Sequence, residues 1–201
     1  LRTLALSIAL TACGTAVEID RSPDPATREV DASAVEVPWP VVPFPALPET
    51  NESEAVLAAR ADLGRLLFYD PILSVDRETA CASCHSEIWG MGDGLPRSIG
   101  HGGGTLSGPG RKGGPELRRN SPQLWNLAFR KTLFWDGRRG SLEVQALDPL
   151  EAVDELNRAP DEVVADLRKN AAYRSLFAAA FPDDPQPSVS HLASALASFE
   201  R

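Results

Sequence analysis

Apolar residues recur at helical spacing over most of the chain beyond residue 50. In the last of these stretches, Leu192, Ala195, Leu196 and Phe199 stand at i, i+3, i+4 and i+7, so one face of a helix is apolar. No segment shows the alternation of apolar and polar residues that predicts a half-buried strand. The pattern therefore predicts an all-α fold. The expected helices cover residues 51–69, 142–147, 160–169, 171–181 and 189–200.

The first of these helices has boundary signals at both ends. Asn51 and Glu54 have the spacing of a capping box, in which two side chains bond the free N–H groups of the first turn. The pair Asp70-Pro71 is expected to end the helix, because a proline disfavours helical backbone in the residue before it. The apolar stripe that we expect to be buried consists of Val56, Leu63, Leu66 and Leu67.

Two other stretches carry no helical pattern. Between Asp20 and Pro48 the chain holds seven prolines and several acids, which predicts an extended tether. Between Gly90 and Gly114 it holds eleven of its fifteen glycines, which predicts a long irregular loop. Loops of this length are usually functional or mobile. A short helix is expected just before this loop, over residues 81–85.

The chain begins with the features of an export signal. Arg2 precedes the apolar run Leu4–Leu10, which is too short to span a bilayer as a helix. The Leu-Thr-Ala-Cys sequence that ends at Cys13 resembles the bacterial lipobox, whose cysteine carries lipid in the mature protein. We therefore expect residues 1–12 to be a lipoprotein-type signal peptide. Residues 13–50 would then tether a periplasmic domain to a membrane. The alternative to the lipobox is an ordinary signal peptide in which Cys13 is incidental.

The strongest chemical signal is Cys81-Ala82-Ser83-Cys84-His85. Two cysteines three apart lie on one face of a helical turn and match the two vinyl groups on a haem edge. A zinc site would need four ligands, and no second cysteine pair completes one. A thioredoxin-like pair would need a βαβ setting, and a structural disulfide would not account for the histidine. We therefore predict haem c bound covalently by Cys81 and Cys84, with His85 as the proximal iron ligand.

The residues alone leave the opposite face of the iron open. An electron carrier usually places Met or His there. Met91 is six residues from His85, too close to reach the other face, and is expected to fill the core. His191 begins the last predicted helix and is expected at the surface or as a cap. His101, in the glycine-rich loop, fits a removable ligand and a surface histidine equally well.

Composition and charge narrow the expected partners. The chain has 201 residues, enough for one domain plus tails, and a net charge of −8 with scattered basic residues. A nucleic-acid partner is not expected, because such a surface needs a basic face. An acidic protein can instead dock a basic partner such as a small electron carrier. Because the chain lacks an initiator Met and its last residues read as an unfinished helix, we expect a fragment of a longer reading frame.

Taken together, the motifs resemble the bacterial dihaem cytochrome c peroxidase family, which includes the dihaem enzyme of methylamine utilisation. Its members have two cytochrome-c-like domains, a peroxidatic one followed by an electron-entry one. The resemblance implies that residues 51–201 are the first domain, with one haem here and a second in a domain that is missing. The matching stretches are Leu63–Phe68, Leu73–Ser74, Cys81–His85, Asp93–Gly94, Ser98–His101, Arg119–Pro122, Phe134–Arg138, Ser141–Ala146, Pro149, Glu155–Leu156 and Ala195–Arg201.

The resemblance also implies roles for single residues. His101 matches the distal ligand that leaves the iron in many members when the other haem is reduced. Glu155 matches the catalytic acid–base, and Gln145 matches a polar residue of the same pocket. A carboxylate suits this role because peroxide cleavage needs a proton moved from the inner oxygen to the outer one. Without the resemblance, Glu155 would be interpreted as a solvated acid and Gln145 as a helix surface residue.

Further residues match features between the two family domains. Trp135 matches an aromatic that lies between the haems and implies an electron path, although core packing would also hold its ring. Asn120 matches a ligand of a calcium ion. Two departures from the family pattern stand out. Leu156 replaces a common Met, and residues 104–116 look like an insertion after the predicted distal histidine.

The expected function is therefore the reduction of hydrogen peroxide to water, with electrons from a small periplasmic cytochrome c or cupredoxin. Three alternatives stay open. One is a family member that oxidises a partner protein or an organic substrate. Another is a non-enzymatic electron-transfer or sensing cytochrome, and the third is a structural anchor whose haem motif is unfilled. The protein could also form a homodimer. We expect lipid on Cys13 to hold it at a membrane.

Overall fold

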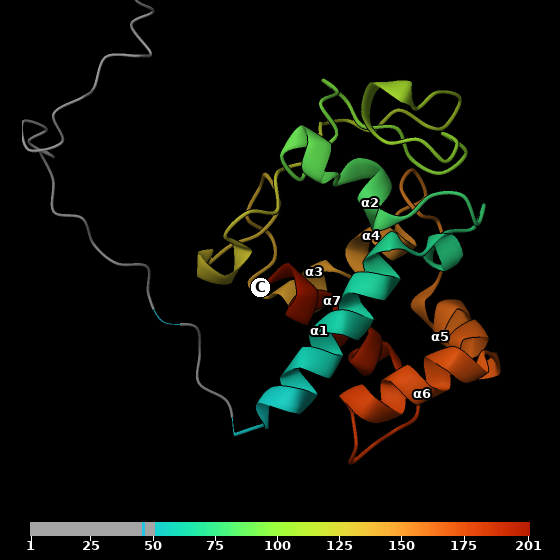
Figure 1. The fold of residues 1–201 in the computed structure, drawn as a ribbon. Coiled ribbons are helices and arrows are strands. Elements are labelled where there is room, and N and C mark those ends of the chain that lie inside the picture. The colour runs from blue at the N-terminus through green and yellow to red at the C-terminus, as the bar shows by residue number, and fades with distance from the viewer. Residues whose placement is uncertain (1–45, 47–50) are drawn as a thin grey trace, which may run out of the picture. The chain divides into compact units, whose positions relative to one another are not determined.

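The computed structural model describes Ala46 and residues 51–201 (Figure 1). The signal peptide predicted at 1–12, the lipid-bearing Cys13 and the tether predicted at 13–50, Ala46 apart, lie outside the described residues. Within the described residues the regular structure is helical, and β contacts are limited to three isolated bridges. The all-α prediction is therefore confirmed for this part of the chain. The α-helices are α1 (Glu54–Tyr69), α2 (Cys81–Cys84), α3 (Leu142–Gln145), α4 (Asp148–Glu151), α5 (Pro160–Lys169), α6 (Ala171–Ala180) and α7 (Val189–Glu200).

A polar residue stands at each end of α1. The side chain of Ser53 accepts a hydrogen bond from the N–H three residues later, at 3.3 Å. The capping box predicted from Asn51 and Glu54 is therefore wrong, because Ser53 is the residue adjacent to the first turn and Glu54 already belongs to the helix. At the other end Asp70 stops the helix as predicted. Its carboxylate then caps the 3₁₀ helix η3 (Pro71–Leu73).

The core lies where α1 packs against α7 and α6 (Figure 1). Leu63 and Leu67 of the predicted stripe are fully buried, and so are Leu192 and Leu196 on α7. Leu66 of the same stripe remains 41% exposed. Removal of these leucine side chains from water supplies the main favourable energy of the helix contacts.

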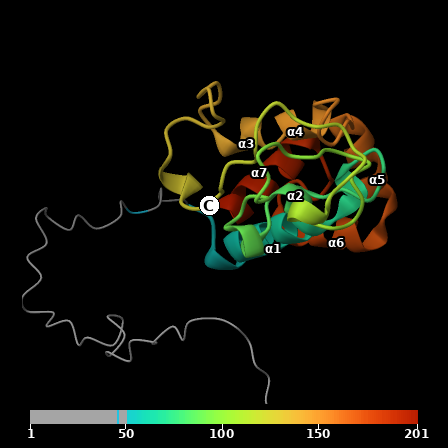
Figure 2. The same cartoon turned by 90° about the horizontal axis from the view of Figure 1, so that it is seen from above.

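A long irregular stretch joins α2 to α3 and lies on one side of the helices, green to yellow in Figure 2. It includes the glycine-rich segment over residues 90–114, which has no α-helix, as predicted. Three 3₁₀ helices interrupt the stretch, η4 (Glu87–Trp89), η5 (Gly108–Gly110) and η6 (Leu127–Phe129). Among the described residues, no helix combines the length and the apolar character needed to cross a membrane.

The predicted helices differ from the observed ones mainly near the middle of the chain. The bounds of α5 and α7 match the prediction, whereas α3 stops two residues early. The prediction missed α4, because a single turn has no apolar period to detect. Its proline, Pro149, is favoured in a first turn. The N-cap of α7 is Ser188 and not His191. The ring of His191 stacks on Phe181, with the ring centroids 4.1 Å apart.

Gly64 lies at the closest approach of α1 to α7. A Cβ added there would lie 1.9 Å from the carbonyl oxygen of Ala195, so Gly64→Ala must push the two helices apart. We expect this substitution to lower the free energy of unfolding by about 1–3 kcal/mol, measured by urea or thermal denaturation. Gly140→Ala is the matched control, since nothing lies within 4 Å of the Cβ that it would add. Equal effects of the two substitutions would contradict the close contact.

Candidate active site

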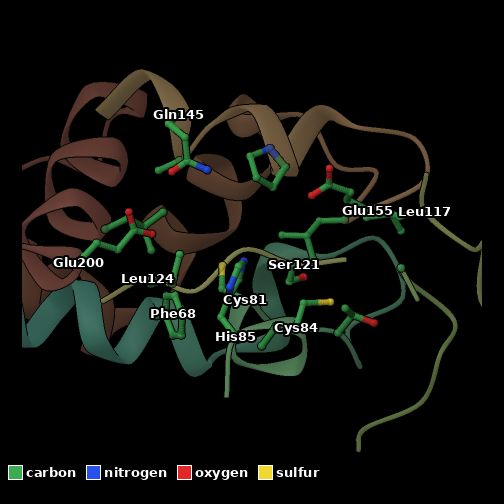
Figure 3. Close-up of a pocket in the computed structure, with 17 residues that line it drawn as sticks. Phe68, Cys81, Cys84, His85, Leu117, Ser121, Leu124, Gln145, Glu155 and Glu200 are labelled. Atoms are coloured by element: carbon green, nitrogen blue, oxygen red, sulfur yellow. The ribbon is translucent and has the colours of Figure 1, made fainter. Parts of the chain in front are cut away.

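A pocket opens between the helical core and the long loop (Figure 3). Its lining is mainly apolar, and it holds about 640 Å³ of empty space including its mouth. Side chains reach it from α1, α2, α3, α4, α7 and the connecting segments. Those with reactive or polar groups include Cys81, Cys84, His85, Gln145, Glu155 and Glu200.

Cys81 and Cys84 are the first and last residues of α2, so one turn directs both side chains to the pocket. The hydroxyl of Ser83 accepts a hydrogen bond from the N–H of Ala80 at 3.0 Å, which fixes the start of this turn. Burial raises the pKa of both thiols, that of Cys84 to about 11, so both are protonated near neutral pH. Neither forms a disulfide. Two free thiols on one turn are therefore available at the edge of the pocket.

The backbone orients the imidazole of His85. Its Nδ1 lies 3.0 Å from the carbonyl oxygen of Met91, so Nδ1–H donates and Nε2 is left to bind a metal. Burial lowers the pKa of His85, although the carbonyls of Met91 and Pro122 act in the opposite direction. The ring is therefore neutral near pH 7, as a metal ligand must be. Met91 is 9% exposed within the core, which confirms it as a core residue.

These residues fit a c-type haem. The pocket offers two thiols that can bond to a porphyrin edge, a neutral imidazole that can bind iron, and apolar walls for the ring. Phe68 from α1 lies beside His85, with the ring centroids 6.4 Å apart. The structure thus brings Cys81, Cys84 and His85 together as the motif predicts.

Glu155 enters the same pocket from the segment after α4, across from the cysteine pair (Figure 3). Burial raises the pKa of Glu155 to about 7, Asp154 adds to the rise, and Arg138 opposes it. Its carboxyl can therefore hold or release a proton near neutral pH. Gln145, at the end of α3, also lines the pocket. The alternative interpretations of Glu155 as a solvated acid and Gln145 as a surface residue are therefore wrong.

The ring of His101 does not line this pocket. Its Nε2 lies 3.2 Å from the carbonyl oxygen of Val153, and its backbone N–H donates to the carbonyl of Glu155 at 2.7 Å. The preceding Gly100 does line the pocket, and a Cβ there would lie 1.8 Å from the carbonyl oxygen of Asp154. The structure thus places the backbone of the glycine-rich loop beside Glu155 and leaves the ring of His101 outside.

Two charged residues that the sequence interpretation missed hold this loop. Asp76 accepts hydrogen bonds from the N–H of Gly102 and from the hydroxyl of Thr79. Burial alone would raise the pKa of Asp76, but its hydrogen bonds, that from Gly102 first, hold it below its usual range. Arg111 is 3% exposed. Its guanidinium donates to the carbonyls of Ile99, Gly100, Gly104 and Leu106 and to the hydroxyl of Thr79.

The position of Arg111 within a glycine-rich segment could have indicated this role from the sequence. Turns rich in glycine leave backbone carbonyls without helical or sheet partners, and a buried carbonyl needs a donor. An arginine supplies five N–H donors at one point. A single arginine can therefore hold several turns of such a loop.

Trp135 and Asn120 contact each other rather than the pocket. The indole Nε1–H of Trp135 donates to the backbone carbonyl of Asn120 at 3.0 Å. Trp135 is 58% exposed, so the alternative of a core tryptophan is wrong. The turn around it has left-handed backbone at Phe134 and Gly137, with φ of 66° and 71°, and leaves the ring outside the core.

Glu200 is a pocket residue that the sequence interpretation missed. It is the last residue of α7, and its Oε2 is buried with no hydrogen-bond partner among the described residues. Figure 3 shows it at the end of the pocket away from Glu155. Glu200 follows the buried Leu196 by four residues and so lies on the apolar face of its helix. An acid on an apolar face could have indicated a buried carboxyl from the sequence.

Comparisons with known proteins agree with this site. The family model described as "Di-haem cytochrome c peroxidase" matches residues 58–201. The chain is 33% identical over 195 residues to "Methylamine utilization protein MauG" of Methylorubrum extorquens, covering 96% of this chain and 52% of the relative. It is 32% identical over 159 residues to "Cytochrome c551 peroxidase" of Pseudomonas aeruginosa, covering 79% and 43%. The chain thus spans about half the length of these relatives.

A solved structure shows the same fold. It is described as "a MauG-like protein associated with microbial copper homeostasis", and it matches with a TM-score of 0.64 and 33% identity. The match covers 83% of this chain and 46% of that protein. The helical arrangement around the pocket therefore recurs in a protein of related sequence.

Removal of the Arg111 guanidinium should loosen the loop that borders the pocket. Arg111→Met keeps an apolar stem but leaves buried carbonyls without donors, so we expect a loss of about 1–3 kcal/mol in the free energy of unfolding. Amide hydrogen exchange should quicken over residues 99–106, measured by mass spectrometry. Arg118→Met, which removes an exposed arginine, is the control. Unchanged exchange over residues 99–106 would contradict this role of Arg111.

Proposed function

Because the chain belongs to the di-haem cytochrome c peroxidase family, we propose that residues 51–201 form the peroxidatic domain of an enzyme that reduces hydrogen peroxide to water. The electrons come from a small cytochrome c or cupredoxin, by way of a second haem in the rest of the longer protein. The observation that carries the proposal is Glu155, a partly buried acid in the same pocket as Cys81, Cys84 and His85.

Three residues hold the cofactor in this proposal. Cys81 and Cys84 bind haem c through thioether bonds, and His85 binds its iron through Nε2. Met91 keeps the His85 ring in the required tautomer through its carbonyl. The haem, when bound, supplies the iron at which peroxide binds and electrons arrive.

Glu155 manages the proton in this reaction. Its carboxylate would take a proton from one oxygen of a peroxide in the pocket, and the resulting acid would give that proton to the other oxygen, which would leave as water. The whole reaction consumes one peroxide, two electrons and two protons and yields two waters. A pKa near 7 suits a group that must accept and donate in one turnover. Gln145 can donate its amide N–H to an oxygen in the pocket and so orient the substrate.

Further parts of the proposal concern residues at the edge of this site. His101 would bind the iron in the resting protein, and its ring would then have to leave the carbonyl of Val153. Trp135 would carry electrons between the two haems, and its hydrogen bond to Asn120 would hold the indole in place. Asn120 contributes an oxygen ligand to a calcium ion between the domains. Lipid on Cys13 anchors the domain in the periplasm.

A second candidate is an oxidase that acts on a partner protein or an organic substrate. The observation that favours it is the match to a methylamine utilization protein over 96% of this chain. Both candidates need the same haem and the same acid. They differ in whether a small electron carrier or another substrate supplies the electrons to peroxide.

Substitution of Glu155 tests the proposed chemistry. In the complete protein with haem attached, we expect Glu155→Gln to reduce peroxide-dependent oxidation of reduced cytochrome c by about 10²–10⁴-fold, because an amide cannot relay the proton. The absorbance of the bound haem should be unchanged. Turnover is measured in a stopped-flow or steady-state assay of cytochrome c oxidation.

The matched control is Glu151→Gln, which changes an exposed acid on α4 four residues earlier. This variant should keep the activity of the unaltered protein. Near-normal turnover in Glu155→Gln would remove Glu155 from the mechanism. If the unaltered protein consumes peroxide without oxidising any small electron carrier, the second candidate is favoured.

A further inference from the structure

Glu200 gives the pocket a second acid that the proposed mechanism does not use. Its carboxyl lines the same cavity as Cys81 and His85, although it comes from the end of α7, over 100 residues later in the chain. Figure 3 shows Glu200 beside Leu124 at one end of the cavity and Glu155 at the other. Glu200 is therefore placed to act on a group bound between them without competing for the position of Glu155.

Among the described residues, no arginine forms an ion pair with Glu200. The neighbouring Arg201 pairs with Glu143 of α3, on the outside of the fold. Oε2 of Glu200 is buried without a hydrogen-bond partner among the described residues. Burial raises the pKa of Glu200 to about 8, Arg201 opposes the rise and Glu143 adds to it. The carboxyl can therefore gain or lose a proton near neutral pH.

No cation is among the described residues that line the pocket, although Arg111 lowers the pKa of Cys84 and Arg138 that of Glu155. α1 presents the uncharged Phe68, and neither α5 nor α6 adds an ionisable side chain to the lining. α2 and its end contribute Cys81, Cys84 and the neutral His85. The segment after α4 contributes a further acid, Glu155. The pKa of Glu200 should therefore depend on the charge of any group that binds in the pocket.

We propose that Glu200 is a redox-linked proton site, which takes up a proton when the haem iron in this pocket is reduced and releases it when the iron is oxidised. This inference rests on haem binding at Cys81 and Cys84 but not on peroxide as the substrate. The electron comes from the reduced electron carrier, and the proton comes from water and binds a carboxylate oxygen of Glu200. Each electron that enters is thus accompanied by up to one proton.

The physical reason is the interaction of two charges in a medium of low polarity. An electron added to the iron makes a nearby carboxylate less favourable, and the weak screening of a buried site lets that effect reach across the pocket. The affinity of Glu200 for a proton therefore rises on reduction. By linkage, the midpoint potential of this haem falls as the pH rises through the range in which Glu200 ionises. Reduction of peroxide consumes protons and electrons in equal number, so such a site stores one proton beside the place of reaction.

The test is the pH dependence of the midpoint potential in the complete protein with haem attached. Spectroelectrochemical titrations between about pH 6 and pH 10 would compare the unaltered protein with Glu200→Gln, which keeps the shape but cannot ionise. We expect the potential of this haem to fall with pH in the unaltered protein. In Glu200→Gln the slope above about pH 7 should shrink by at least half. Since Glu155 is present in both proteins, the difference reports Glu200 alone.

Two further variants make the result decisive. Glu200→Asp restores an ionisable group and should restore most of the slope, and Glu151→Gln, an exposed acid, should leave it unchanged. A slope that is the same in Glu200→Gln and the unaltered protein, with haem bound in both, would overturn this inference and leave the proposed function intact. Absence of covalent haem from the matured protein would overturn both.

Discussion

The close contact of α1 with α7 at Gly64 is the constraint on which the pocket depends. The backbone of α7 lies where a Cβ on Gly64 would be, at 1.9 Å from the carbonyl oxygen of Ala195. From that contact, Phe68 is four residues further along α1, and Glu200 is five residues further along α7. Both side chains line the pocket. The packing of these two helices therefore sets the position of an aromatic wall and a buried acid.

The opposite side of the pocket is built from backbone without regular structure, and polar groups take over the role of packing there. Arg111 and Asp76 hold the glycine-rich loop in place through hydrogen bonds to its backbone. The carbonyl of Met91 fixes His85 in a similar way. Ordering a glycine-rich loop is costly in entropy, and buried charge-assisted hydrogen bonds are strong enough to offset part of that cost. A small number of charged residues can therefore determine the geometry of this long loop.

Much of this arrangement is readable from the sequence, and the failures have physical causes. α5 and α7 follow from periodicity and a proline at the start of α5, whereas the single turn of α4 is too short to show a period. The CxxCH motif predicts its own site because its residues are adjacent. Glu155 and Gln145 needed the family resemblance, since their meeting depends on tertiary folding. Glu200 was missed because the helix that carries it was interpreted as apolar alone.

Two partly buried acids in one apolar cavity are unfavourable for a protein that binds nothing there. Burial removes the hydration of each carboxylate, and a neighbouring acid adds to that effect, so the pKa of Glu155 and that of Glu200 are both raised. A stable fold would be reached more easily with glutamine or leucine at these positions. The acids become useful when the pocket holds a centre whose charge changes during turnover, because a group that ionises near neutral pH can follow that change. The electrostatic cost of burying both acids in this pocket is thus an argument for a redox cofactor within it.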